Sequence, residues 1–158
     1  MPLRDPPDGF AVESATPDDR LDILRVLDAA MLETDTETVD AAVDAGDALV
    51  ARFDRTDAVV GALVSVRRET DWLHVDAVAV RRSRRGRGVG SALVAGAVRR
   101  GERDPGIEVV TAEFDAELKG FYRNLGFDIV PVADDDNSDD ERFRGHRCVR
   151  GGSVDSID

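Results

Sequence analysis

The pattern of apolar residues along the sequence predicts a single α/β domain. A length of 158 residues is typical of one domain, and 42% apolar residues are enough for a sizeable core. Period-two and continuous apolar runs predict strands, whereas a spacing of three to four predicts helices. In chain order these patterns give a strand, two helices, three strands, a helix, a strand, a helix and two strands. We expect the domain to span residues 10–150, after a loose lead-in (1–9) and before a disordered tail (151–158).

The first elements are a short strand over residues 10–15 and two helices. Thr16 followed by Pro17 is typical of a helix start, because threonine caps the N-terminus and proline suits the first helical position. The apolar stripe that this helix is expected to bury comprises Leu21, Leu24, Val26, Leu27 and Met31. The second, shorter helix ends at Gly46, since glycine readily adopts the left-handed conformation of a C-cap.

The remaining elements follow from the same patterns. Three strands are expected over residues 48–53, 58–68 and 72–80. After them come a helix over 91–103, a strand over 107–114, a helix over 115–125 and a strand over 127–132. The stretch 134–141 is acidic and has no apolar residue, which predicts a loop. A last strand over 143–150 is expected at an edge of the sheet.

A glycine-rich segment joins the strand that ends at Val80 to the helix that begins near Ser91. It contains three alternating glycines, Gly86, Gly88 and Gly90. Around them lie five arginines: Arg81, Arg82, Arg84, Arg85 and Arg87. Unpaired N–H groups at a helix N-terminus favour a bound phosphate, and glycine lets the phosphate approach the backbone. The segment is therefore predicted to bind a phosphate group.

Two common phosphate loops do not fit this segment. A Walker A loop has a lysine before the serine or threonine that opens the helix, whereas Gly90 precedes Ser91 here. A dinucleotide fingerprint has a third glycine three residues after the second, and that position is again Ser91. Neither a P-loop nucleotide nor a dinucleotide is therefore expected.

The segment does match a third pattern. Arg85-x-x-Gly88-x-Gly90 resembles the acyl-CoA pyrophosphate loop of the GNAT superfamily of N-acyltransferases, written Gln/Arg-x-x-Gly-x-Gly/Ala. Further along, Phe121-Tyr122, two polar residues and Leu125-Gly126-Phe127 resemble a helix-turn-strand segment of the same superfamily. The resemblance covers roughly residues 10–149. It implies the GNAT fold, a mixed, mostly antiparallel sheet of about six to seven strands flanked by about four helices. It also implies an N-acetyltransferase that uses acetyl-CoA and needs no metal.

The resemblance implies where the acyl donor binds. The backbone amides of the loop would hold the pyrophosphate, and Arg85 and Arg87 would add positive charge. The donor-binding residues implied in the loop are Arg85, Gly86, Arg87, Gly88, Val89, Gly90 and Ser91. On the preceding strand, backbone groups of Val80 would pair with pantetheine. The Val78 N–H would face the thioester carbonyl and stabilise the oxyanion formed when an amine attacks.

Four side chains are candidates for catalysis. By resemblance, Tyr122 would protonate the CoA thiolate as it leaves. Period-two alternation predicts that His74, Asp76, Val78 and Val80 share one face of their strand. His74 or Asp76 could then act as the general base that the protonated amine requires, with Glu113 as a third candidate. Each of these side chains could instead pack in the core or face solvent.

Several positions depart from the family pattern. Asp115 stands where the family often has an asparagine that bonds pantetheine, and Leu118 stands where a small alanine is usual. Asp115 can still cap the following helix. Arg84 replaces the usual aromatic residue of the loop. His146 and Cys148 alternate on the last strand, but two residues do not make a metal site.

The charge composition is unusual and resembles that of haloarchaeal proteins. The net charge is −12, with 20 Arg against 1 Lys and 24 Asp against 9 Glu. Such a surface repels itself at low salt and is screened at high salt. A high-GC genome favours the same residues, so both explanations stay open. Global acidity argues against general nucleic-acid binding.

The sequence predicts a cytoplasmic protein. No apolar run reaches the length of a membrane-spanning helix, and residues 1–9 lack the apolar region of a signal peptide. The single cysteine, Cys148, excludes an internal disulfide and a cysteine-based zinc site. No membrane partner is expected.

The acceptor is predicted only as an amine, on a small molecule or a protein. In the family the first two helices and the last two strands shape the acceptor site, and these parts carry Asp35, Glu37, Asp40 and the acidic stretch 134–141. Acidic walls suit a cationic amine such as a polyamine, an aminoglycoside or a protein lysine. Two other functions stay open, a non-catalytic acetyl-CoA sensor and an arginine-rich nucleic-acid arm, although the arm lacks interleaved aromatic residues. Many relatives form homodimers, which is possible here.

Overall fold

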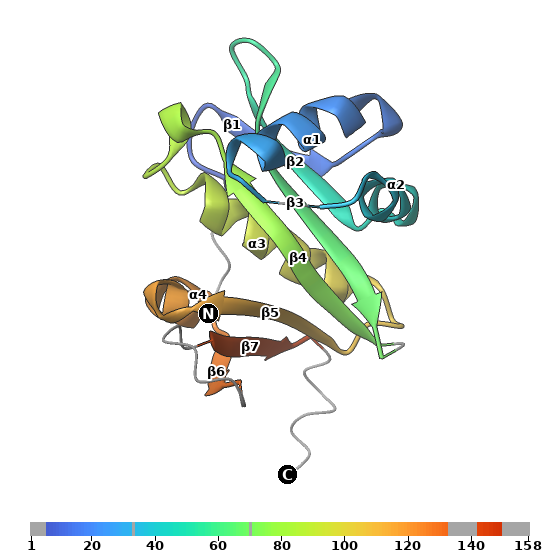
Figure 1. Cartoon of the computed structure of the whole chain (residues 1–158), viewed down its shortest axis with the longest axis vertical. Coiled ribbons are helices and arrows are strands. Elements are labelled where there is room, and N and C mark those ends of the chain that lie inside the picture. Colours follow the sequence, from blue (N-terminus) through green and yellow to red (C-terminus); the bar gives the residue numbers. More distant parts are fainter. Residues whose placement is uncertain (1–5, 33, 70, 133–141, 150–158) are drawn as a thin grey trace.

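The computed structural model describes residues 6–32, 34–69, 71–132 and 142–149. Its strands form one sheet of seven, in the order β1-β2-β3-β4-β5-β7-β6 (Figure 1). The strands are β1 (Phe10–Ser14), β2 (Ala48–Phe53), β3 (Ala58–Arg68), β4 (Trp72–Val80), β5 (Val109–Asp115), β6 (Asp128–Pro131) and β7 (Arg142–Cys148). Neighbouring strands are antiparallel except β4 and β5, which are parallel. The predicted mixed, mostly antiparallel sheet is confirmed.

Four α-helices in the described ranges flank the sheet. They are α1 (Arg20–Ala29), α2 (Thr36–Ala45), α3 (Val89–Arg103) and α4 (Lys119–Asn124). Short 3-10 turns, Pro17–Asp19 and Ala116–Leu118, precede α1 and α4. The element order agrees with the sequence prediction, although α3 begins at Val89, two residues earlier than expected. None of the described helices has both the length and the apolar character needed to cross a membrane.

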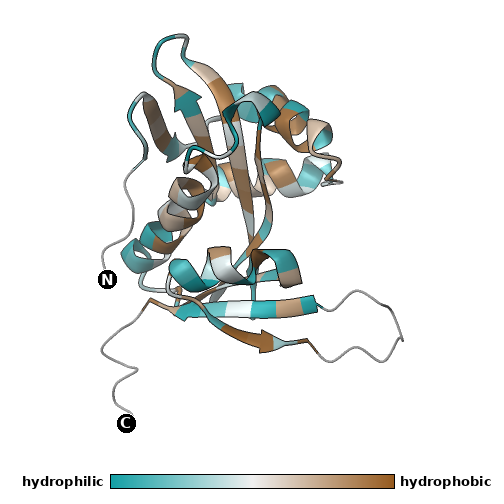
Figure 2. Ribbon diagram, turned by 90° about the vertical axis from the view of Figure 1, so that its left-hand side faces the viewer, coloured by the Kyte–Doolittle hydropathy of each residue, from teal (hydrophilic) through white to brown (hydrophobic). Residues whose placement is uncertain are grey.

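The helices divide the core into two layers. One cluster joins α1 and α2 to β2 and β3, with Ile23, Val39 and Val64 fully buried. The other joins α3 and α4 to the opposite face of the sheet and includes Leu93 and Phe114. Figure 2 shows the apolar residues concentrated on the strands between these helix layers. In Figure 1, α1 and α2 lie in front of β2 and β3, whereas no helix covers the front of β5, β7 and β6.

Strand β4 contains a bulge that the sequence pattern did not reveal. Val64 of β3 pairs with Ala77, but the next residue of β3 pairs with Val75, so Asp76 has no partner on β3. Before the bulge, Val75 packs in the α3 cluster; after it, Val78 packs there instead. The prediction that His74 shares a face with Val78 and Val80 is therefore wrong. An inserted residue reverses the in-and-out alternation of every residue that follows it.

Helix α1 buries a different stripe from the one predicted. Leu21 and Met31 are 56% and 88% exposed, whereas Ile23, absent from the predicted stripe, is fully buried. The cause is that Pro17–Asp19 forms a 3-10 turn and the α-helix ends at Ala29. Met31 lies beyond the helix with a positive φ of 62°, so its side chain leaves the helical face.

Strand β7 is internal rather than at the sheet edge, which corrects the prediction for the last strand. It pairs with β5 on one side and β6 on the other. Its neighbour β6 is only four residues long. The hydrophobicity of β7 therefore does not distinguish an internal position from one at the edge of the sheet. The predicted loop 134–141 and tail 151–158 lie outside the described residues, as do residues 1–5 of the lead-in.

Candidate functional site

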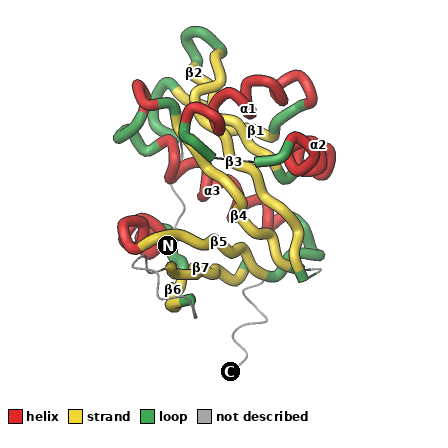
Figure 3. Tube along the Cα trace, in the orientation of Figure 1, coloured by secondary structure: helices red, strands yellow, loops and turns green. Residues whose placement is uncertain are grey.

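The parallel strands β4 and β5 pair over only part of their length. Pairing runs from Trp72–Val109 to Val75–Ala112. Beyond it β4 continues to Val80 and β5 to Asp115 without pairing to each other. Figure 3 shows the two strands close together at one end and apart at the other. The second half of β4 therefore has one edge on which its backbone lacks a strand partner.

The polar backbone groups of Val78 and Val80 lie on this open edge. Arg81 N–H donates to the Val60 carbonyl of β3 at 2.7 Å. Because N–H directions alternate along a strand, Val80 and Val78 point their N–H and C=O groups away from β3. The Val80 carbonyl accepts a hydrogen bond from Arg85 Nε at 3.0 Å. An extended ligand that used this carbonyl would have to displace the Arg85 side chain.

The glycine loop begins where β4 ends and opens α3, a helix of 15 residues. Gly86 and Gly88 have positive φ values of 79° and 87°, and Gly88 is the N-cap of the helix. A Cβ atom at either glycine would meet no atom within 4 Å, so the space beside them is open. The unpaired N–H groups of the first helical turn and the helix dipole give this opening the electrostatic character that an anion prefers.

The five arginines of the loop divide into two groups. Arg84 stacks on the Phe53 ring, with its guanidinium carbon 4.2 Å from the ring centre, and Arg81 Nε donates to the Val59 carbonyl at 3.1 Å. These two side chains fix the loop to β2 and β3. Arg82, Arg85 and Arg87 are exposed, which leaves them available to an anion. The aromatic partner of Arg84 was not identifiable from the sequence, because Phe53 lies 31 positions earlier in the chain.

The start of α3, the end of β4 and helix α4 meet at Gly90. A Cβ atom on Gly90 would lie 3.8 Å from Val80 Cγ2 and 3.9 Å from the Phe121 ring. Val89 is buried beside them, and Ser91 follows in the first turn of the helix. The structure thus brings the two sequence motifs together, although about thirty residues separate them in the chain.

Tyr122 of α4 belongs to a cluster of aromatic side chains. Its ring stacks on Phe114 of β5 at 4.3 Å and meets the rings of Phe121 and Phe127 edge-on at 5.0 and 5.3 Å. The residue is 3% exposed, and this burial raises the pKa of Tyr122 to about 12. The phenol therefore keeps its proton throughout the neutral range, as a proton donor must.

His74 lies on the face of the sheet opposite to Val78. Its Nδ1 atom is 2.8 Å from the Thr111 hydroxyl of β5, and both residues are buried. Burial, with a smaller contribution from Arg68, lowers the pKa of His74 below its usual value. The imidazole is therefore neutral at pH 7 and one ring nitrogen can accept a proton. Thr111 was not predicted, because the register of a parallel pair cannot be read from sequence.

The two carboxylates among the candidate general bases, Asp76 and Glu113, differ in whether they are free to accept a proton. Asp76 is exposed at the bulge, between His74 and the open edge of β4. Glu113 bonds to Arg144 of β7 at 2.9 Å, and this hydrogen bond lowers the pKa of the Glu113 carboxyl. A carboxylate held in an ion pair is a weak base, so Glu113 is the poorest of the three candidates. Asp115, as expected, accepts a hydrogen bond from the Glu117 N–H and caps the turn before α4.

Within the described ranges, no group of three or more His, Cys, Asp or Glu side chains could hold a metal ion. Cys148 is exposed at the end of β7. The candidate groups for chemistry in this region are the backbone amides of β4 and the loop together with Tyr122, His74 and Asp76.

Comparison with known proteins gives consistent results. No curated protein sequence matches the chain. Among solved structures, Ard1 from Thermoplasma volcanium is similar, with a TM-score of 0.71 at 19% identity over 89% of this chain and 98% of that chain. NAA60 from Arabidopsis thaliana in complex with a bisubstrate analogue has a TM-score of 0.69 at 15% identity over 90% and 99%. The ribosomal-protein-S18-alanine N-acetyltransferase from Escherichia coli has a TM-score of 0.69 at 12% identity over 89% and 94%.

The similarity to these solved structures establishes the fold. A sequence model described as "Acetyltransferase (GNAT) domain" matches residues 44–129, more than half of the chain. The matched segment runs from the end of α2 to β6, and so contains the bulged strand, the glycine loop and the aromatic cluster. The chain is therefore a member of the GNAT acetyltransferase family.

Proposed function

We propose that the protein transfers an acetyl group from acetyl-CoA to a primary amine by direct attack within one ternary complex. Acetyltransferases of this family use acetyl-CoA as the donor. The observation that carries the proposal is the open edge of β4 at Val78 and Val80, which leads directly into the glycine loop. Backbone groups without a strand partner suit the two amides of pantetheine once the Arg85 side chain leaves the Val80 carbonyl, and the loop suits the pyrophosphate.

The chemistry follows from the groups at this edge. The amine lone pair attacks the thioester carbon, and the Val78 N–H stabilises the resulting oxyanion. Collapse of this intermediate breaks the carbon–sulfur bond and releases CoA as a thiolate. Tyr122 donates its proton to the sulfur, and the amine proton goes to the general base. The products are free CoA and the acetylated amine.

His74 is the proposed general base, and Asp76, which lies between His74 and the open edge of β4, relays the amine proton to it through water. An alkylamine is mostly protonated at pH 7 and must lose a proton before it attacks. His74 is neutral at this pH, and the exposed Asp76 carboxylate lies two residues closer to Val78. Thr111 is then a positioning residue, because its hydroxyl fixes the orientation of the imidazole.

Replacing His74 by glutamine is expected to lower kcat by about 10²-fold, the usual contribution of a general base, without changing acetyl-CoA affinity. Steady-state release of free CoA measures the first quantity and calorimetry the second. Thr111→Val removes the hydrogen bond but keeps the shape, so it should lower kcat by a smaller factor, and Thr111→Ser should restore it. An unchanged kcat in His74→Gln would exclude His74 as the base.

The lowered pKa of His74 also predicts how stability depends on pH. The unfolded chain binds a proton at His74 near the ordinary value of about 6.5, before the folded protein does. The contribution of neutral His74 to stability is thus present above pH 6.5 and is lost as pH falls toward the folded-state pKa. Urea unfolding between pH 7.5 and 5 should show a smaller loss of stability in His74→Gln than in the wild type.

Two measurements test the proposed function. Calorimetry in molar KCl first shows whether the protein binds acetyl-CoA, and the release of free CoA with a panel of amines then shows whether it turns over. Binding together with turnover supports the enzyme. Binding without turnover for any amine would instead support a non-catalytic acetyl-CoA sensor. Absence of binding in a folded sample would overturn the proposal.

We also propose that the protein is adapted to a cytoplasm of high salt concentration, as in haloarchaea. Its net charge of −12 resides largely on aspartate, and self-repulsion destabilises a compact acidic domain at low ionic strength. Raising KCl from about 0.1 to 2 M shortens the Debye length from about 10 Å to below 3 Å. The melting temperature should then rise by about 5 °C or more, or roughly 2 kcal/mol for a domain of this size. An unchanged melting temperature would favour a high-GC genome as the cause.

A further inference from the structure

Helix α4, which carries Tyr122, is too short to hold its own position. It has six residues, Lys119–Asn124, and isolated helices of this length do not persist in water. On its N-terminal side, Asp115 accepts a hydrogen bond from the Glu117 N–H at 3.1 Å and caps the preceding turn. The place of the Tyr122 hydroxyl therefore also depends on the contacts that join the C-terminal end of α4 to the sheet.

Arg147 of β7 provides such a contact. Its Nη1 atom donates to the carbonyl of Leu125, the C-cap residue of α4, at 2.6 Å. Alternate residues of a strand share a face, so Arg147 lies on the same face as Phe143, which is buried in the α3 and α4 cluster. The last carbonyls of a helix have no partner within it, and an arginine close to the end can supply one. The hydrogen bond thus ties α4 to an internal strand of the sheet.

The turn after α4 leaves room for the Arg147 guanidinium. A Cβ atom at Gly126 would lie 3.0 Å from Arg147 Nη1 and 3.3 Å from its Cζ atom, so the guanidinium occupies the space that a side chain would need. The N–H groups of Leu125 and Phe127, on either side of this glycine, both donate to the Tyr122 carbonyl, at 3.0 and 3.1 Å. Arg147 therefore contacts the turn that is hydrogen-bonded to the backbone of Tyr122.

The aromatic contacts of Tyr122 leave one direction of movement open. Its ring stacks on Phe114 of β5 with an angle of 11° between the ring planes. Stacking resists tilting of the ring, but a ring can slide along its partner with little change in contact. The edge-on partners Phe121 and Phe127 move with α4, because they belong to the helix and to the chain directly after it. A hydrogen bond has a preferred length and direction, so the bond from Arg147 opposes a displacement of α4 along β7.

We propose that Arg147 is a positioning residue for Tyr122: it holds α4 against β7, so that the phenol lies where the CoA thiolate leaves. This inference rests on the proposed N-acetyltransferase function and on Tyr122 as its acid. In this role Arg147 touches neither the donor nor the acceptor and acts through the helix alone. It lies outside the family-matched residues 44–129, and no sequence motif pointed to it, because its partner carbonyl is 22 positions away.

Titration of Tyr122 tests the position of α4 without any substrate. In Arg147→Met, the absorbance midpoint of the phenolate in the folded protein should fall from about 12 toward the ordinary value of about 10, because the hydroxyl becomes more exposed to water. Loss of a positive charge alone would raise the pKa of a neighbouring phenol, so a fall reports exposure. Arg147→Lys keeps a charged donor and should restore most of the wild-type midpoint. A midpoint that stays at about 12 in Arg147→Met would overturn the proposal.

A double-mutant cycle with Tyr122→Phe tests the effect on catalysis. Arg147→Met should lower kcat by about 10- to 10²-fold, the effect of a misplaced catalytic group, and leave acetyl-CoA affinity unchanged. In the Tyr122→Phe background the same change should lower kcat by less than about twofold, because no hydroxyl remains to be misplaced. Steady-state release of free CoA, with an amine that the wild type acetylates, gives kcat for each variant. An equal loss in both backgrounds would mean that Arg147 only stabilises the fold, and would overturn the proposal.

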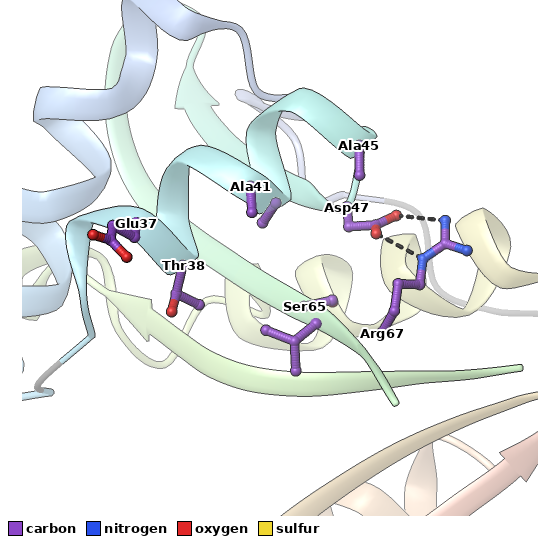
Figure 4. A pocket seen from close by; sticks show the side chains of 9 residues that line it. Glu37, Thr38, Ala41, Ala45, Asp47, Ser65 and Arg67 are labelled. Atoms are coloured by element: carbon purple, nitrogen blue, oxygen red, sulfur yellow. Dashed lines mark hydrogen bonds and ion pairs between the residues drawn. The ribbon is translucent and has the colours of Figure 1, made fainter. Parts of the chain in front are cut away.

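Two other arginines serve as controls. Arg123→Met removes an exposed charge from the last turn of α4 itself. Arg67→Met removes an arginine that anchors another part of the protein, since Arg67 Nε donates to Asp47 at 2.8 Å beside the hollow between α2 and β3 (Figure 4). Arg100 also pairs with Asp47 at 3.3 Å, so this carboxylate keeps a partner. Both controls should keep the Tyr122 midpoint at about 12, and a fall as large as in the Arg147 variant would contradict the proposal.

The role of Arg147 and the proposed function fail in different ways. An unchanged Tyr122 midpoint or equal losses of kcat exclude the role of Arg147, and the enzyme stands. Absence of acetyl-CoA binding by the folded wild type contradicts the enzyme itself. Circular dichroism of each variant, at each pH of the titration, separates exposure of Tyr122 from loss of fold. Should Arg147→Met not fold, Arg147→Gln, which has a shorter polar side chain, replaces it.

Discussion

Replacing Gly88 by tryptophan is expected to abolish acetyl-CoA binding in a protein that remains folded. A Cβ atom at Gly88 would meet no atom within 4 Å, so we expect an indole attached there to occupy the opening before the first turn of α3. A phosphate bound to the N–H groups of that turn needs the same space. Calorimetry in molar KCl measures the result, and we expect affinity to fall by at least about 10²-fold, below detection.

A matched pair of alanine variants separates backbone strain from loss of the site. Gly88 and Gly9 both have a positive φ, 87° and 90°, and a Cβ atom at Gly9 meets only the Phe53 ring at 3.7 Å. Either Gly→Ala change should cost about 1–2 kcal/mol of stability, because L-residues disfavour this conformation. Only Gly88→Ala should also weaken acetyl-CoA binding. Equal weakening in both variants would mean that destabilisation, rather than the loop, explains the loss.

The glycine loop could be predicted from the sequence because its conformation depends on the local spacing of its glycines. Gly86 and Gly88 are needed at fixed offsets from the helix start, and the structure places them there with left-handed backbones. The charge of the loop was only partly predictable. Five arginines are adjacent in the chain, but Arg84 packs on Phe53 of another strand, and such a partner appears only once the sheet has formed.

The prediction that His74 shares a face of β4 with Val78 and Val80 was wrong for a related reason. Alternation in sequence determines which residues share a face only while the pairing has no bulge, and Asp76 introduces one. Local patterns cannot show this insertion, because it is defined against β3 and not within β4. The bulge has a consequence for the site, since it exposes Asp76 and turns Val78 toward the α3 layer while His74 stays on the other face.

The Tyr122→Phe variant is expected to lose most of its activity while binding acetyl-CoA as well as the wild type. Phenylalanine preserves the stacking on Phe114 and the edge contacts with Phe121 and Phe127, so only the hydroxyl is removed. Loss of a proton donor to the leaving thiolate costs about 10²–10³-fold in kcat. Steady-state CoA release gives kcat, and calorimetry shows whether donor affinity is unchanged. A wild-type kcat in this variant would mean that Tyr122 serves the aromatic cluster alone.

The protonation of Tyr122 can be observed directly, because it is the single tyrosine of the chain. Ultraviolet absorbance of the phenolate should titrate at about 12 in the folded protein and near the ordinary value of about 10 in denaturant. Since the folded-state pKa is the higher one, the stability linked to the protonated phenol is present below pH 10 and is lost as pH rises toward 12. A native midpoint near 10 would place the hydroxyl in water. Water could then protonate the thiolate itself. That result would contradict both the burial of the hydroxyl and the proposed role of Tyr122 as the acid.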